Sequence, residues 1–325
     1  MRDGHCLRVC APALAAVVAT VLAGGAALAE EAREGWVSQY RPTGPAEVVS
    51  YESHMIAPPP PSLGLDPFYR QYADAQGIPV IASDRVEGAA LLIARDIVNE
   101  MLAERPDIRA ELVRKGARVG IMAIDEGIMD LPEMRGWTKP EPGDPRLTRC
   151  EKEFYHQIAA MSDRDYWNAR VRGMGGLFTT SGEEMLLGTP GTRYFGENIL
   201  IHEFSHNMLS AIREIDPALY RRVEEAYAQA KEAGLWEYSY ATTTVQEYWA
   251  EGSQFWFNSN NAYKYGDTVV LTSEDLQRYD PALAAVLRAA YGDRHRIAAD
   301  VFHNHPARLA HAPIPAGGKC TSMWG

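Results

Sequence analysis

The alternation of apolar and polar residues predicts short strands in the first part of the chain. Ile78-Pro79-Val80-Ile81 is a brief apolar run typical of a buried strand, and Ala117–Ile124 has the same character. Between these runs, apolar residues recur at helical spacing from Gly88 to Leu102. Residues 175–180 and 184–187 are expected to form two further strands, so that most of the sheet precedes residue 190.

Helical spacing of apolar residues dominates the rest of the chain. Helices are expected around residues 199–212 and 245–257, and over Pro217–Ala233, Ser273–Tyr279 and Pro281–Tyr291. Strands that come first and helices that follow them indicate an α+β fold, with a small twisted sheet and a helical half.

The N-terminus has the pattern of an export signal. Arg2 and Arg8 precede an apolar stretch from Ala11 to Leu28, and a small-residue A-x-A site ends at Ala29. We therefore expect residues 1–29 to be a signal peptide cleaved after Ala29, which gives a secreted or periplasmic protein. An uncleaved anchor helix is the alternative. No other segment is apolar enough for stable insertion into a membrane after cleavage.

The remainder divides into a lead-in and one domain. Residues 30–65, which include Pro58-Pro59-Pro60-Pro61, are expected to be extended, with a regulatory role left open. Residues 66–325 form the predicted domain, and 46% hydrophobic residues in the chain provide for a sizeable core. The net charge of −11 argues against nucleic acid as a partner. The oligomeric state does not follow from the sequence.

Signal cleavage changes the cysteine count. Cys6 and Cys10 would leave with the signal, so that Cys150 and Cys320 remain. Two cysteines in an exported chain most simply form one disulfide, here between Cys150 and Cys320. Two free thiols are the alternative.

One segment carries a specific chemical pattern. His202-Glu203-Phe204-Ser205-His206 reads H-E-x-x-H within the helix expected around residue 202. Residues four apart share a helix face, so His202 and His206 could bind one zinc ion while Glu203 handles a proton. Two histidines satisfied within the core are the alternative.

A third ligand is expected on the helix around residues 245–257. Its aromatic residues recur at helical spacing, which indicates burial, yet it also carries Glu247 and Glu251 on one face. Buried carboxylates are costly unless they are paired or bind a metal. We expect Glu247 to bind the zinc and Glu251 to hydrogen-bond a histidine ligand. The reversed assignment and two solvated surface charges are the alternatives.

The pattern H-E-F-x-H followed by E-Y-W-A-E resembles the gluzincin clan of zinc peptidases, in particular the catalytic domain of anthrax lethal factor and its bacterial relatives. That resemblance implies one zinc per chain, held by His202, His206 and Glu247. It implies that Glu203 is the general base. It also implies that Tyr240, seven residues before Glu247, assists at the oxyanion.

The resemblance spans roughly residues 190–260 and implies a zincin-like fold. Ser205 and Tyr248-Trp249 depart from the family's motifs, which removes any basis for transferring a substrate. In such peptidases an edge strand before the metal helix pairs with the substrate backbone, and Met185-Leu186-Leu187 is the segment expected here.

These features predict an exported zinc-dependent endopeptidase that acts on a peptide or protein substrate. A catalytically silent zincin-like module that binds protein or glycan is the alternative. The cleavage specificity does not follow from the sequence.

Overall fold

The computed structural model of the protein describes residues 56–324. The expected signal peptide and most of the lead-in lie outside the described residues. Within residues 56–324, no helix has both the length and the apolar character that crossing a bilayer requires.

The strands are β1 (Gln71–Asp74), β2 (Pro79–Ala82), β3 (Arg118–Met122), β4 (Gly173–Met174), β5 (Phe178–Gly182), β6 (Tyr263–Tyr265) and β7 (Thr268–Val270). The helices are α3 (Gly88–Met101), α4 (Pro106–Arg114), α5 (Arg149–Glu153), α6 (Tyr155–Ala160), α7 (Asp163–Arg170), α8 (Glu183–Leu187), α9 (Ile199–Ile215), α10 (Pro217–Glu232), α11 (Val245–Trp256), α12 (Ser273–Tyr279), α13 (Pro281–Tyr291) and α14 (Ala307–Ala310). Short 3-10 turns are η1 (Pro61–Leu63), η2 (Ile128–Asp130), η3 (Pro132–Met134), η4 (Tyr240–Thr242) and η5 (Ala316–Gly318).

Five strands form one mixed sheet in the order β1-β2-β3-β5-β4. The three central strands run parallel, and β1 and β4 pair antiparallel with their neighbours at the two edges. Along β2, Val80 and Ala82 belong to the larger apolar cluster, whereas Ile81 belongs to a second cluster. Since successive side chains point to opposite faces of a sheet, β2 is buried on both sides, as is typical of parallel strands.

The expected α+β fold is confirmed. The sheet is complete by residue 182, and the helices α9–α13 follow it. The predicted helices over Ser273–Tyr279 and Pro281–Tyr291 have the bounds of α12 and α13. The helices α4–α7 were not predicted, and only a few of their residues are buried.

Of the two strands predicted before the metal helix, the first is confirmed in part and the second is wrong. Residues 178–180 lie in β5, whereas residues 175–177 form the turn of the β4–β5 hairpin, and residues 184–187 lie in helix α8. Met185, Leu186 and Leu187 follow two glutamates, a run of good helix formers, and the helix ends at Gly188 with a left-handed φ of 65°. Because Met185 and Leu186 are fully buried, this segment cannot be a substrate-binding edge strand. The edge strand here is β4.

The two helices that carry the expected metal ligands pack directly on each other. The Asn198 side chain caps the start of α9, and the Thr244 hydroxyl accepts a hydrogen bond from the Glu247 N–H at the start of α11. The indole of Trp249, which is fully buried, donates a 3.0 Å hydrogen bond to the carbonyl oxygen of Ser205. This bond fixes the register of α11 against α9.

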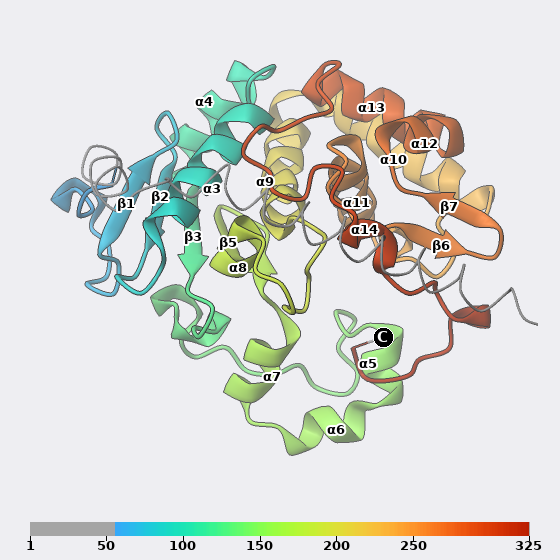
Figure 1. Cartoon of the computed structure of the whole chain (residues 1–325), viewed down its shortest axis with the longest axis horizontal. Coiled ribbons are helices and arrows are strands. Elements are labelled where there is room, and N and C mark those ends of the chain that lie inside the picture. Colours follow the sequence, from blue (N-terminus) through green and yellow to red (C-terminus); the bar gives the residue numbers. More distant parts are fainter. Residues whose placement is uncertain (1–55, 325) are drawn as a thin grey trace, which may run out of the picture.

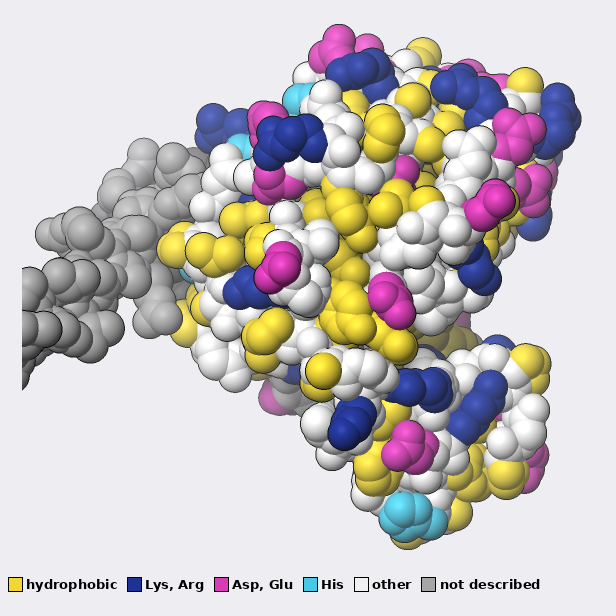
Figure 2. All heavy atoms as spheres, turned by 90° about the vertical axis from the view of Figure 1, so that its right-hand side faces the viewer, with side chains coloured by type: hydrophobic (Ala, Val, Ile, Leu, Met, Phe, Trp, Pro, Cys, Tyr) yellow, Lys and Arg dark blue, Asp and Glu magenta, His cyan; other side chains and the backbone are white. Residues whose placement is uncertain are grey.

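Helices α5–α7 lie below the main body, and the C-terminal end of the described chain lies beside α5 (Figure 1). The predicted disulfide between Cys150 and Cys320 is present and joins α5 to this C-terminal segment, with 5.4 Å between the Cα atoms. Figure 2 shows the face where the main body narrows above this smaller part, with hydrophobic side chains gathered along its middle.

The disulfide closes a loop of 170 residues. In the chain-entropy model, a loop of this length stabilises the folded state by at most about 5 kcal/mol. We predict that the double variant Cys150→Ser/Cys320→Ser loses about 2–5 kcal/mol of unfolding free energy, measured by denaturant titration. In the presence of a reductant, the wild type should unfold at the same denaturant concentration as the double variant. Equal midpoints for the oxidised wild type and the double variant would contradict a stabilising role.

Candidate metal centre

Helix α9 places three chemically active side chains at one point. His202, Glu203 and His206 each offer a ligand atom within 4.8 Å of the others, and they form the one group of this kind found among residues 56–324. The two imidazole rings lie with their centroids 5.0 Å apart and are nearly perpendicular, at 77°. The i, i+4 spacing therefore brings both rings to one face, as the sequence predicts.

Glu247 reaches this group from α11. Its Oε2 lies 3.0 Å from Nε2 of His202 and 3.4 Å from Nε2 of His206. Two ligands that each bind a tetrahedral zinc ion at ~2.1 Å lie about 3.4 Å apart. The two imidazoles and this carboxylate thus have the chemistry and the separations of three ligands of one zinc ion.

Gln254, one turn after Glu251 on α11, orients the first histidine. Its amide nitrogen donates to the carbonyl oxygen of Asn198, which leaves its oxygen 3.0 Å from Nδ1 of His202 as an acceptor. When Nδ1 carries the proton, the Nε2 lone pair of His202 faces Glu247 and is available for a metal. Glu251 is farther from the same Nδ1, at 3.5 Å, and accepts a 2.8 Å hydrogen bond from Asn260. The sequence reasoning missed Gln254.

Buried carboxylates surround the two histidines. Burial raises the pKa of Glu203 and of Glu251. Glu197, which the sequence analysis did not single out, lies just before α9. Burial and the charge of Glu251 raise the pKa of Glu197 to about 8. Burial also acts to raise the pKa of Glu247, but its hydrogen bonds with the two histidines outweigh burial and lower it.

This negative surrounding favours a cation. Burial disfavours the charged form of His202, yet the Glu247 hydrogen bond and the nearby carboxylates outweigh burial and raise the pKa of His202 to about 10. Several carboxylates within a few ångströms repel one another unless positive charge is placed between them. A divalent metal ion between the two histidines and Glu247 would supply that charge.

Glycines let the edge strand β4 approach the metal helix. A Cβ on Gly173 would lie 2.4 Å from Cγ2 of Ile199 and 2.9 Å from Cγ of Glu203, and a Cβ on Gly175 would lie 2.8 Å from the His206 side chain. The backbone N–H of Gly175 also donates to the Glu203 carboxylate. The Gly-rich turn was visible in the sequence, but its role depends on this tertiary contact.

Tyr240 lies at the mouth of the site, on the turn η4. Its ring stacks on that of His202, with centroids 6.3 Å apart and 23° between the planes, and 46% of the residue remains exposed. Partial burial and the charge of Glu247 raise its pKa, so its hydroxyl keeps its proton and can donate a hydrogen bond.

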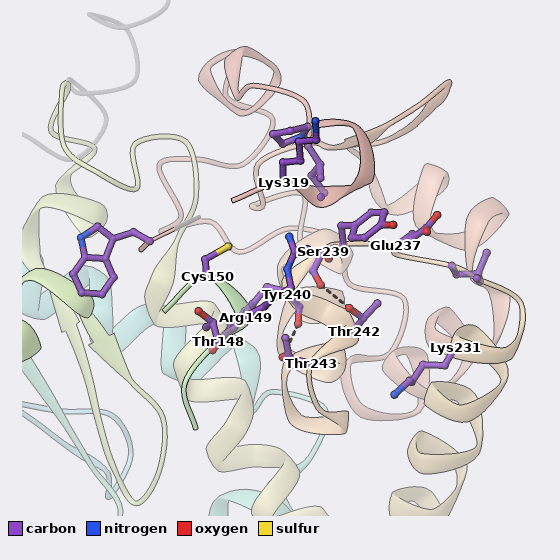
Figure 3. A pocket seen from close by; sticks show the side chains of 17 residues that line it. Thr148, Arg149, Cys150, Lys231, Glu237, Ser239, Tyr240, Thr242, Thr243 and Lys319 are labelled. Atoms are coloured by element: carbon purple, nitrogen blue, oxygen red, sulfur yellow. Dashed lines mark hydrogen bonds between the residues drawn. The ribbon is translucent and has the colours of Figure 1, made fainter. Parts of the chain in front are cut away.

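Two adjoining hollows open beside the metal site. One has a volume of about 490 Å³ and is lined by His202, Glu203 and the C-terminal Trp324, among others. The second, of about 650 Å³, shares Thr148, Tyr240 and Trp324 with the first. Figure 3 shows the second hollow, with Tyr240 and Thr148 among the side chains at its wall. We call the two hollows together the cleft.

The comparisons with known proteins leave the family open. No protein-family model and no curated protein matches the chain. Among solved structures, 11 chains match. One is the Pro-Pro endopeptidase from Paenibacillus alvei, with a TM-score of 0.39, 16% identity and coverage of 65% of this chain and 96% of that chain. At this level of similarity, residue roles have to come from the geometry of the site, and the relation to anthrax lethal factor stays a prediction.

We predict that Gln254→Ala weakens zinc binding about 10- to 100-fold, because the ring of His202 loses the partner that fixes its orientation. Competition with a chromophoric chelator measures the affinity. Gln246→Ala is the matched control, since Gln246 is an exposed glutamine on the same helix. Equal losses of zinc affinity in the two variants would show that Gln254 has no orienting role.

Proposed function

We propose that this protein is a zinc-dependent endopeptidase. The observation that carries the proposal is the convergence of His202, His206 and Glu247 from two packed helices, with a further carboxylate, Glu203, beside them. Three protein ligands and one open position are typical of catalytic rather than structural zinc. A hollow that His202 and Glu203 line, and a second hollow that adjoins it at Tyr240, leave room for a peptide or protein chain beside the site.

Support for Glu247 as the third ligand comes from its position. Its carboxylate faces Nε2 of both histidines, whereas Glu251 faces Nδ1 of His202 from behind the ring. A metal bound at both Nε2 atoms is therefore within reach of Glu247. Glu251 lies on the other side of the ring, where it supports His202. The supporting group closest to His202 is Gln254, at 3.0 Å.

Glu203 is the proposed general base. A zinc ion bound at this site would lower the pKa of its bound water and polarise the scissile carbonyl. Glu203 accepts a proton from the attacking water and delivers it to the leaving amine. Burial, which raises the pKa of this carboxyl, makes it a stronger base, and the Gly175 N–H fixes one side of it.

Tyr240 is the proposed oxyanion donor. Its hydroxyl keeps its proton because its pKa is raised, and its stacking on His202 holds the ring beside the metal ligands. A hydrogen bond that forms fully only as the carbonyl oxygen gains charge stabilises the transition state more than the substrate.

We also propose that the protein is exported. The support is the basic, apolar and A-x-A pattern of residues 1–29, together with a disulfide of the kind that persists in oxidising compartments. Secretion and a periplasmic location are both compatible with these features.

Glu203→Gln tests the catalytic proposal. The amide keeps the size of the side chain but cannot accept a proton, so we predict zinc content near one per chain and a loss of at least about 10³-fold in kcat/KM on a diverse peptide library. Metal analysis and mass-spectrometric detection of products measure both. A zinc-loaded wild type that cleaves no peptide would favour the silent binding module, and unchanged turnover in the variant would remove Glu203 as the base.

Glu247→Gln and Glu251→Gln form a matched pair that tests the ligand assignment. We predict that Glu247→Gln loses most of its zinc affinity, because a neutral amide replaces a negatively charged ligand. Glu251→Gln should lose affinity by a smaller factor, about 10-fold, as expected of a second-shell group. Zinc retained by the first variant and released by the second would reverse the assignment.

A further inference from the structure

Away from the metal centre, the wall of the cleft carries more basic than acidic residues, although the chain as a whole is acidic. The protein has a net charge of −11. The two hollows are nevertheless lined by six cationic residues, namely Arg149, Arg170, Arg172, Arg193, Lys231 and Lys319. Apart from the carboxylates that surround the metal centre, the acidic residues lining them are Glu151 and Glu237. An excess of basic side chains on this part of the wall favours a ligand group of negative charge there.

Arg172 uses four of its five N–H donors within the protein. Its guanidinium makes a bidentate pair with Glu184, at 2.7 Å for both hydrogen bonds, and it also donates to the backbone carbonyls of Glu126 and Ala123. Its role is to tie the strand β4 to helix α8 and to the end of the sheet.

The guanidinium of Arg193 is fixed in position and has N–H donors available for a ligand. Its guanidinium lies over the rings of Tyr194 and Trp324, at 4.9 and 5.6 Å from their centroids. One nitrogen, Nη1, donates to the backbone carbonyls of Ala169 and Arg170. The structure assigns no partner within residues 56–324 to Nε and Nη2, the edge that is suited to a bidentate carboxylate. Aromatic stacking fixes the plane of the fork before any ligand arrives.

Arg170 lies next to Arg193 and is fixed differently. Nε and Nη2 of Arg170 bind the buried carboxylate of Glu151, at 2.5 and 3.2 Å. Glu151 is itself saturated by the hydroxyl of Tyr166 and the backbone N–H of Thr148. A buried carboxylate with this many donors serves to position the guanidinium, and Arg170 still lines the hollow beside Tyr240.

We propose that Arg193, with Arg170 beside it, binds a carboxylate of the substrate and makes the enzyme selective for acidic peptides. This inference rests on the proposed peptidase function. Glu203 and Glu251 line the same hollow beside His202, so that a substrate carboxylate at that point would face acidic groups rather than guanidinium groups. The acidic group is therefore directed to the arginines, and the scissile bond to the metal.

Arg193→Gln is the direct test, with Arg222→Gln as the matched control, because Arg222 is exposed on α10 and lines neither hollow. The probes are peptides that the wild type cleaves, in pairs that differ only by Asp or Glu against Asn or Gln near the cleaved bond. We expect the wild type and Arg222→Gln to prefer the acidic member of each pair about 10- to 100-fold in kcat/KM. Arg193→Gln should lose that preference, because its kcat/KM on the acidic member of each pair falls to that on the neutral member.

A second set of peptides shows whether the bound carboxylate belongs to a side chain or to the C-terminus of the substrate. Peptides with a free C-terminus are compared with the same peptides carrying a C-terminal amide. If the preference for the acidic side chain is the same in peptides with a free C-terminus and in amidated peptides, the subsite binds the side chain of Asp or Glu. A preference lost on amidation assigns it to the chain terminus. No preference in either comparison, or an equal preference in the wild type and Arg193→Gln, would overturn the proposal.

A binding measurement separates this inference from the proposed activity. Zinc-loaded Glu203→Gln and the double variant Glu203→Gln/Arg193→Gln are titrated with the same fluorescent peptides, so that no cleavage is needed. We expect Glu203→Gln to bind the acidic peptides about 10- to 100-fold more tightly than the neutral ones, and the double variant to bind both equally. If Glu203→Gln binds acidic peptides more tightly but the wild type cleaves no peptide, the proposed peptidase function is refuted and the carboxylate subsite is kept. If the wild type cleaves peptides but Glu203→Gln binds acidic and neutral peptides equally, the subsite is refuted and the peptidase function is kept.

Discussion

The packing of α11 against α9 is the contact on which the rest of the site depends. Neither helix holds the proposed metal ligands alone, because α9 supplies two imidazoles and α11 supplies the carboxylate that lies at 3.0 and 3.4 Å from them. The apolar core and the hydrogen bond from the Trp249 indole to the Ser205 carbonyl fix that register. Burying charged groups costs free energy. The pairing of these groups with one another and the packing of the two helices offset that cost.

The sequence allowed those parts of the site to be predicted that follow from spacing along a single helix. His202 and His206 share a face because they are four residues apart, and the helices α10, α12 and α13, in which apolar residues recur at helical spacing, were predicted close to their observed bounds. Gln254 and Glu197 were missed because their importance comes from contacts across helices. The helix at Met185-Leu186-Leu187 was missed because a short apolar run fits a strand and a buried helix equally well.

Electrostatics divides the cleft into two parts. Around the metal centre the carboxylates predominate, so that a cation is favoured there and anions are repelled. Farther along the same hollow, the guanidinium groups of Arg170 and Arg193 predominate. In the proposed peptidase, a substrate with a negative group at one distance from its scissile carbonyl would fit this pattern in one orientation, so the charges of the cleft would also set the direction of the bound chain.

The disulfide joins the two segments that hold Arg170 and Arg193 in position. Cys150 precedes Glu151, the carboxylate that fixes Arg170, and Cys320 lies in the C-terminal segment whose Trp324 stacks on Arg193 and on Tyr166. Helix α5 and the C-terminal segment are short elements with few buried residues, so neither would hold a side chain in place by packing alone. A covalent link between them therefore does more than add stability, because it keeps the stacked and the ion-paired guanidinium on the same wall of the cleft.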